Sequence, residues 1–196
     1  MKTAVTSALR ERSTNIDMWF SPRLLLVVIA CALVAPSFAQ ASAPWREYRS
    51  REGRYSIQMP GLPTENRQSQ RTEAGEIAVH MAFTTYRGWA FFVAYNDFPM
   101  DLGAESSRRQ AVDGALQGIM RSQVDARVLK RADFKWQNNP ALDATFEFGP
   151  PENRGQVVWR GILVGNRLYQ IMVLSANGAP GADETKRFVD SFRLRS

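Results

Sequence analysis

The chain has 196 residues and a formal net charge of +6, with 44% hydrophobic and 22% charged residues, which is typical of a globular protein of about one domain. It contains one cysteine and one histidine. These counts exclude a disulfide framework and any metal site that needs two imidazoles or a cysteine cluster. The sequence also lacks a phosphate-binding loop, a nucleophile elbow and an H-E-x-x-H motif. Composition therefore limits the class of protein but indicates no particular reaction.

Residues 1–41 have the pattern of a secretory signal peptide. An uninterrupted apolar run, Leu24–Val34, follows Arg23, and small residues with A-x-A spacing come after it. The run is shorter than the ~20 apolar residues that span a bilayer as a helix. We expect cleavage after Ala39 or Ala41 and a periplasmic or secreted location in a bacterium.

Two features leave alternatives open in this segment. Met18 would begin a shorter signal peptide, in which case residues 1–17 come from a mis-assigned start. Val28–Cys31 resembles a bacterial lipobox, in which Cys31 would be lipidated and would anchor the protein in the cell envelope. We favour ordinary cleavage because the apolar run continues past Cys31 and an A-x-A site follows it.

Cleavage after Ala41 would leave residues 42–196, a segment of 155 residues that we expect to form a single globular α+β domain. The loss of four basic and two acidic residues lowers the formal net charge from +6 to +4, and the only cysteine is lost with them. A domain of this size can fold on its hydrophobic core alone. Its charges are spread along the chain, whereas nucleic-acid binding needs basic residues clustered on one face, so we expect no nucleic-acid partner.

The first half of this segment has strand periodicity. Residues 42–54 predict a short leading strand, and Tyr55–Met59 alternates apolar and polar residues until Pro60 ends the pattern. Residues 66–98 predict a meander of three strands. Its last strand, Trp89–Phe98, is apolar on both faces, so we expect other elements to cover both of its faces.

A helical period replaces the strand pattern at Asp101–Val124, where apolar residues recur on one face of a helix. Ser106 or Ser107 is the expected N-cap, because a serine hydroxyl can accept a hydrogen bond from a free backbone N–H.

The second half of the segment predicts four more strands and a short helix. We expect strands at 126–135, 141–148, 156–164 and 167–175, turns at 137–140 and 165–166, and a helix at 183–191. This order predicts an α+β fold in which one long and one short helix pack on a largely antiparallel sheet.

Arginines and aromatic residues gather around the last predicted hairpin, where a ligand or partner patch is most plausible. Arginine suits carboxylate and phosphate ligands, and aromatic residues are enriched in binding surfaces. The candidate binding residues are Arg154, Trp159, Arg160, Arg167 and Tyr169.

Two carboxylates provide the alternative of an envelope hydrolase. Asp143 and Glu147 lie on the same face of a predicted strand, where their side chains would lean together as a pair of glycosidase carboxylates does. A solvated polar face explains the same spacing. His80 is the only imidazole, and we expect it to be a surface or half-buried side chain of its strand.

Three stretches resemble uncharacterised bacterial exported proteins of the PsbP-like α/β/α sandwich superfamily. They are the opening strand Gly53–Pro60, the hairpin Gly165–Ile171 and the closing segment Arg187–Leu194, which together span nearly the whole mature chain. The resemblance implies the PsbP-like sandwich fold and an accessory or interaction module, and it provides no catalytic residues.

The sequence therefore favours an exported cell-envelope protein that acts as a non-catalytic binding or accessory module. Its partner would be an envelope protein of unknown identity or an anionic ligand. The alternatives are an envelope hydrolase that uses carboxylates and an arginine-based binder of an anionic lipid or polysaccharide surface. We expect no cofactor and no metal, and contact with a membrane only through the alternative lipid anchor at Cys31.

Overall fold

Two antiparallel sheets and two helices make up the described part of the computed structural model, which covers residues 44–72 and 75–195. They confirm the expected α+β class with a largely antiparallel sheet, one long helix and one short helix. In the described ranges, no helix has the length and apolar character needed to span a bilayer. The predicted signal peptide, Cys31 and the cleavage positions Ala39 and Ala41 lie outside the described residues.

The larger sheet contains seven strands in the order β3-β4-β5-β9-β8-β7-β6. Its members are β3 (Thr64–Thr72), β4 (Gly75–Tyr86), β5 (Trp89–Asp97), β6 (Arg127–Trp136), β7 (Asn139–Phe148), β8 (Gly155–Val164) and β9 (Arg167–Ser175). The smaller sheet, in the order β1-β2-β10, contains β1 (Trp45–Ser50), β2 (Tyr55–Pro60) and β10 (Arg193–Leu194). The helices are α2 (Glu105–Arg121) and α3 (Ala182–Asp190). The large sheet thus combines the predicted meander with four later strands, joined where β5 pairs with β9.

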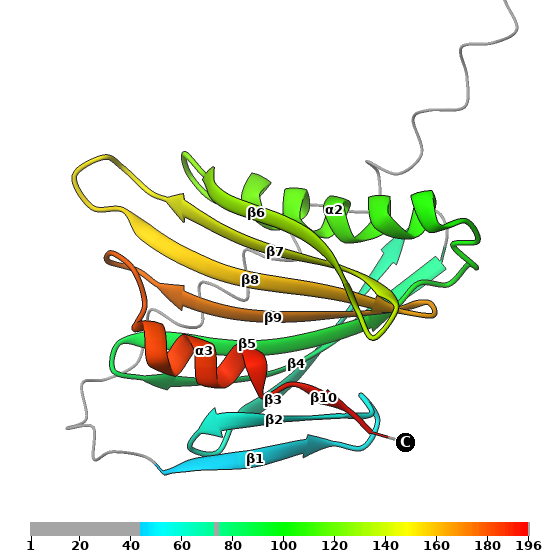
Figure 1. Ribbon diagram of the computed structural model, residues 1–196, viewed down its shortest axis with the longest axis horizontal. Coiled ribbons are helices and arrows are strands. Elements are labelled where there is room, and N and C mark those ends of the chain that lie inside the picture. The colour runs from blue at the N-terminus through cyan, green and yellow to red at the C-terminus, as the bar shows by residue number, and fades with distance from the viewer. Residues whose placement is uncertain (1–43, 73–74, 196) are drawn as a thin grey trace, which may run out of the picture.

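The large sheet is covered on both faces, as Figure 1 shows. Helix α2 packs Leu116 on one face, in a core cluster that includes Ala90 and Phe92 of β5. The small sheet and α3 lie on the other face, in a second cluster that includes Phe91 and Val93. Successive residues of β5 therefore enter different cores, which confirms that this strand is covered on both sides.

Tight two-residue hairpins of the large sheet have central residues with positive φ. The predicted turn at Gly165 and Asn166 joins β8 to β9, with Gly165 at a φ of 58°. The turn expected at 137–140 is shorter than predicted. Only Gln137 and Asn138 lie between β6 and β7, with φ values of 48° and 65°. A two-residue turn of this kind matches the twist of its strands, so β7 already begins at Asn139.

The start of α2 differs from the prediction. Its N-cap is Ala104, and no side chain caps it. Ser106 and Ser107 lie inside the first turn, where a hydroxyl cannot take the N-cap position. Glu105 at the start of the helix places a negative charge near the positive end of the helix dipole, which is a favourable interaction.

Helix α3 fastens the second layer to the large sheet. Its Phe188 is fully buried and meets Phe91 of β5 edge to face, with 5.3 Å between the ring centroids. Val189 of the helix and Phe192, just after it, are also buried in this core cluster.

We expect Phe188→Ala to lower the free energy of unfolding by about 3–5 kcal/mol, because it leaves a cavity where α3 meets the sheet. Urea denaturation followed by tryptophan fluorescence measures this loss. Asp183→Ala on the same helix is the control, since Asp183 is exposed in the first turn and its loss is expected to cost less than about 1 kcal/mol. Equal losses in the two variants would contradict the assigned role of Phe188.

Candidate functional site

The five residues predicted as a binding patch do not meet in one place. Trp159 and Arg160 are neighbours in β8 and point to opposite faces of the sheet. Trp159 is fully buried in the core cluster under α2, where its indole N–H donates to Gln170. Arg154 and Arg167 lie at opposite ends of β8, about 30 Å apart at the rise of a strand.

Arg167 and Tyr169 hold the turn between β1 and β2 against the large sheet. Both oxygens of Asp97 accept hydrogen bonds from Arg167, at 2.7 and 2.6 Å. The same guanidinium donates to the carbonyl of Glu52 at 2.7 Å, and the buried hydroxyl of Tyr169 donates to the carbonyl of Gly53 at 2.8 Å. These two predicted binding residues therefore have internal partners and attach the small sheet to the large one.

The two predicted catalytic carboxylates are each paired with arginine. Asp143 accepts two hydrogen bonds from Arg160, at 2.7 and 2.8 Å. Glu147 pairs with Arg127, and Arg154 Nε lies 3.4 Å from one of its oxygens. Because the two acids are four residues apart in one strand, their Cα atoms are separated by about 13 Å. This arrangement differs from the closely spaced carboxylates of a glycosidase.

His80 is half-buried, as the sequence predicts. Its ring stacks on Tyr95 with 4.6 Å between centroids, and its Nε2 lies 3.5 Å from a carboxylate oxygen of Glu52. A cleft of about 450 Å³ lies beside it, with Tyr48 and Arg67 also in its lining. Among residues 44–72 and 75–195, no three histidine, cysteine or acidic side chains gather into a possible metal site.

A groove of about 960 Å³ lies between α3 and the open face of β6, β7 and β8. It exists because α3 covers only part of this face. Directly paired residues of antiparallel strands point to the same side, so two cross-strand rows form its floor. The rows are Lys130, Thr145 and Val158, and Ala132, Asp143 and Arg160.

A β-bulge shapes the outer wall of this groove. The pairing of β6 with β7 shifts register between Val128 and Lys130, so Leu129 is an extra residue without a partner in the ladder. A bulge re-aims the side chains beside it, and Leu129 and Lys130 both line the groove. Leu129 is 45% exposed. Lys130 has no ion-pair partner within the described ranges, because none of the ion pairs found there includes it.

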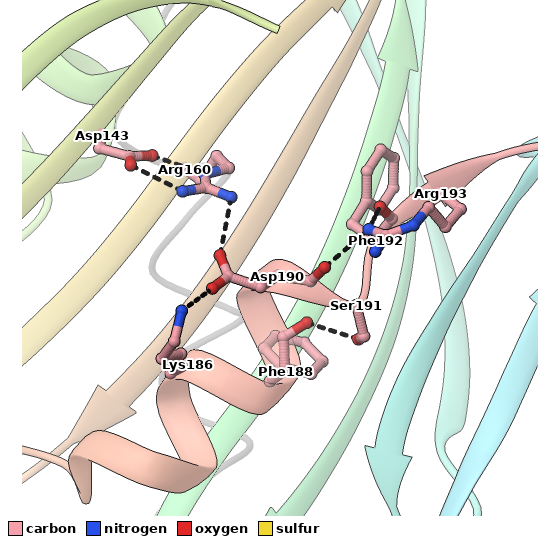
Figure 2. Close-up of polar contacts among 8 residues, drawn as sticks. All are labelled: Asp143, Arg160, Lys186, Phe188, Asp190, Ser191, Phe192 and Arg193. Atoms are coloured by element: carbon pink, nitrogen blue, oxygen red, sulfur yellow. Dashed lines mark hydrogen bonds and ion pairs between the residues drawn. The ribbon is translucent and has the colours of Figure 1, made fainter.

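A chain of ion pairs crosses the groove from the sheet to α3, as Figure 2 shows. Arg160 binds Asp143 on the sheet and reaches Asp190 of α3 at 3.3 Å, and Lys186 pairs with the other oxygen of Asp190. The hydrogen bond from Lys186 holds the pKa of Asp190 below its usual range, with a further contribution from Arg160. The chain ties the helix to the floor of the groove, and the lowered pKa of Asp190 keeps that carboxylate ionised near neutral pH.

Thr185 supplies an unusual polar atom in the inner wall. It lines the groove from α3 and is only 8% exposed. Its hydroxyl is buried, and no hydrogen-bond partner for it occurs among the described residues. Buried hydroxyl groups almost always have a partner, so the lack of one here is unusual.

The sequence prediction missed Leu129, Lys130 and Thr185. One local signal was present for the first two, since Val128 and Leu129 are adjacent apolar residues in a strand that otherwise alternates poorly. Adjacent apolar residues in an edge strand are compatible with a bulge. No signal marked Thr185, because its position opposite β6 depends on how α3 packs.

Comparisons with known proteins give similarity of fold only. No family model matches the sequence. No curated protein matches it either. The chain is similar to the solution structure of CyanoP, the cyanobacterial PsbP of Synechocystis sp. PCC 6803, with 10% identity and a TM-score of 0.48. That alignment covers 82% of this chain and 98% of the other.

Two structures from Pseudomonas aeruginosa are also similar. One is a protein of unknown function, with 11% identity, a TM-score of 0.34, and coverage of 67% of this chain and 83% of that one. The other is the T6SS immunity protein TplEi, with 13% identity, a TM-score of 0.38, and coverage of 88% and 59%. Similarity at this level concerns the arrangement of the backbone, and nothing about activity follows from it.

We expect Asp97→Asn to reveal the strength of the pair with Arg167. The hydrogen bonds from Arg167 hold the pKa of Asp97 below its usual 3.8. A carboxylate with a lowered native pKa stabilises the fold above its unfolded-state pKa, and this contribution is lost as the pH falls through the native pKa. The variant should therefore be less stable by about 1 kcal/mol near pH 7, a value that allows for the exposure of Asp97.

Urea denaturation at a series of pH values measures this difference. The gap between the wild-type protein and the variant should narrow as the pH falls below 3.8 and through the lowered native pKa of Asp97. A gap that is unchanged between pH 7 and pH 2 would show that the ionised pair contributes nothing.

Proposed function

We propose that this protein is a non-catalytic binding or accessory module that holds an acidic, extended segment of a partner protein in the groove beside α3. The supporting observation is the outer wall of the groove, where the bulge places the exposed Leu129 next to Lys130. An apolar side chain beside a cation that lacks an internal partner suits a ligand that alternates apolar and acidic groups.

The charges of the groove favour an acidic ligand. Arg160 is already balanced by Asp143 and Asp190, and Lys186 is paired with Asp190. The groove is nevertheless lined by four cations against two acids, and the cations are Lys130, Arg131, Arg160 and Lys186. Lys130 provides the surplus positive charge at the rim, where rim charges set specificity and the rate of association.

The same contacts give little support to the other two functions considered. A glycosidase-type hydrolase needs two closely spaced carboxylates, whereas Asp143 and Glu147 are about 13 Å apart along their strand and are each paired with an arginine. A binder of anionic surfaces would need free guanidinium groups. Arg154, Arg160 and Arg167 all have carboxylate partners within the protein.

A labelled peptide of alternating valine and glutamate residues tests the proposal. Fluorescence polarisation with the purified protein should show saturable binding of this peptide and weak binding of the peptide with lysine in place of glutamate. Lys130→Glu should weaken binding about tenfold, because it replaces an attraction at the rim by a repulsion.

Lys135→Glu is the matched control for the change of net charge. Lys135 is on the same strand, but its ammonium group lies beside Glu105 of α2, outside the groove. The control should bind the glutamate peptide nearly as well as the wild-type protein. Equal binding of the glutamate and lysine peptides, or equal losses in the two variants, would contradict the proposal.

We also propose that the module acts in the bacterial cell envelope after export. Support comes from the sequence of residues 1–41, with its apolar run and its A-x-A sites. The absence of cysteine from residues 42–196 fits a domain that needs no disulfide in an oxidising compartment.

Mass spectrometry of the protein purified from its envelope fraction should identify an N-terminus at Gln40 or Ser42, which corresponds to cleavage after Ala39 or Ala41. A lipid-modified Cys31 at the N-terminus would show instead that the protein is a lipoprotein, and it would contradict cleavage after Ala39 or Ala41. Retention of residues 1–41 would contradict export by cleavage.

A further inference from the structure

We infer that the acidic segment binds by pairing its backbone with β6, as an additional strand at the edge of the large sheet. This inference rests on the proposed function and specifies how the segment is recognised. The side chains on one face of the added strand would then point toward the groove. The backbone of the added strand would form hydrogen bonds with the free edge of β6.

Strand β6 has the backbone that such pairing requires. It is the last strand in the order of the large sheet, and β7 is its neighbour there. An edge strand has one row of N–H and C=O groups that point away from its neighbour. Beyond the bulge, β6 pairs regularly from Lys130 to Trp136, so its free edge is regular along the same stretch. Most residues of this strand are exposed.

Apolar side chains distinguish this edge from the opposite one. Val128 pairs with Phe146, which lies in the core under α2, so Val128 faces that side, whereas Leu129 lines the groove. They are 42% and 45% exposed. A strand beside β6 would therefore meet an apolar contact on each face. The other edge strand, β3 with the sequence TENRQSQRT, has no large apolar residue.

The charges of β6 also favour an acidic strand. Arg127, Arg131 and Lys135 of this strand are each paired with a carboxylate of the protein itself. Lys130 is the member without a carboxylate partner in the described ranges, and it faces the groove. Glutamates at alternate positions of an added strand share one face, so one of them can lie beside Lys130. Opposite charges on neighbouring strands stabilise the pair, and like charges destabilise it.

Two N-methylated forms of the valine–glutamate peptide test the inference. In one form every valine nitrogen is methylated, and in the other every glutamate nitrogen. Alternate N–H groups of an extended strand point to the same edge, so each form blocks one edge of the peptide and keeps all of its side chains. Polarisation should show a loss of affinity of about tenfold or more for one form, and affinity close to that of the unmethylated peptide for the other.

Equal affinities of the two forms, whether both retained or both lost, would overturn strand pairing. If both are retained, the proposed function still stands, because the side chains alone would then account for binding. If the unmethylated peptide does not bind, the proposed function itself fails. Hydrogen exchange gives a second readout. Added peptide should slow exchange of amides between Lys130 and Trp136 and leave those of β3 unchanged, whereas unchanged exchange in β6 would also overturn the inference.

Discussion

The architecture depends on the need to cover both faces of the central strands. Strand β5 places Phe91 in one core and Phe92 in the other, and β9 does the same with Ile171 and Met172. Strands of this kind are stable only between two layers, because one exposed face would leave a broad apolar surface in water. Helix α2 supplies one layer. The small sheet and α3 supply the other, and both must be held firmly in place.

The contacts that hold this second layer explain where the groove lies. Phe188 inserts from α3 against β5, and Tyr169 and Arg167 bind the carbonyls of the β1–β2 turn. These contacts concentrate the layer over the middle of the large sheet. Strands β6, β7 and β8 extend past it, and their polar face needs no cover, since Thr145 and Asp143 tolerate water. The groove is thus the boundary between the covered and the uncovered parts of one face.

Local patterns predicted the elements well, because a strand, a hairpin or a helix face is determined by residues close in sequence. The alternation of Tyr55–Met59 and the Gly165–Asn166 turn are examples. The candidate site could not be predicted in this way. Arg160 meets Asp190 across thirty residues of chain, and Thr185 faces a groove whose other wall comes from Lys130. Such contacts depend on how α3 packs on the sheet.

The arginines of the predicted binding patch, Arg154, Arg160 and Arg167, all have carboxylate partners within the protein. A guanidinium group binds a carboxylate through two parallel hydrogen bonds, which makes it an effective internal link between elements. Arg160 and Arg167 both make such bidentate contacts, with Asp143 and Asp97. Lysine is a compact, strongly hydrated charge on a flexible stem, so the ammonium group of Lys130 keeps its water at the rim of the groove without an ion-pair partner in the described ranges. Among the cations that line the groove, Lys130 is therefore the one whose charge is balanced by no carboxylate of the described residues.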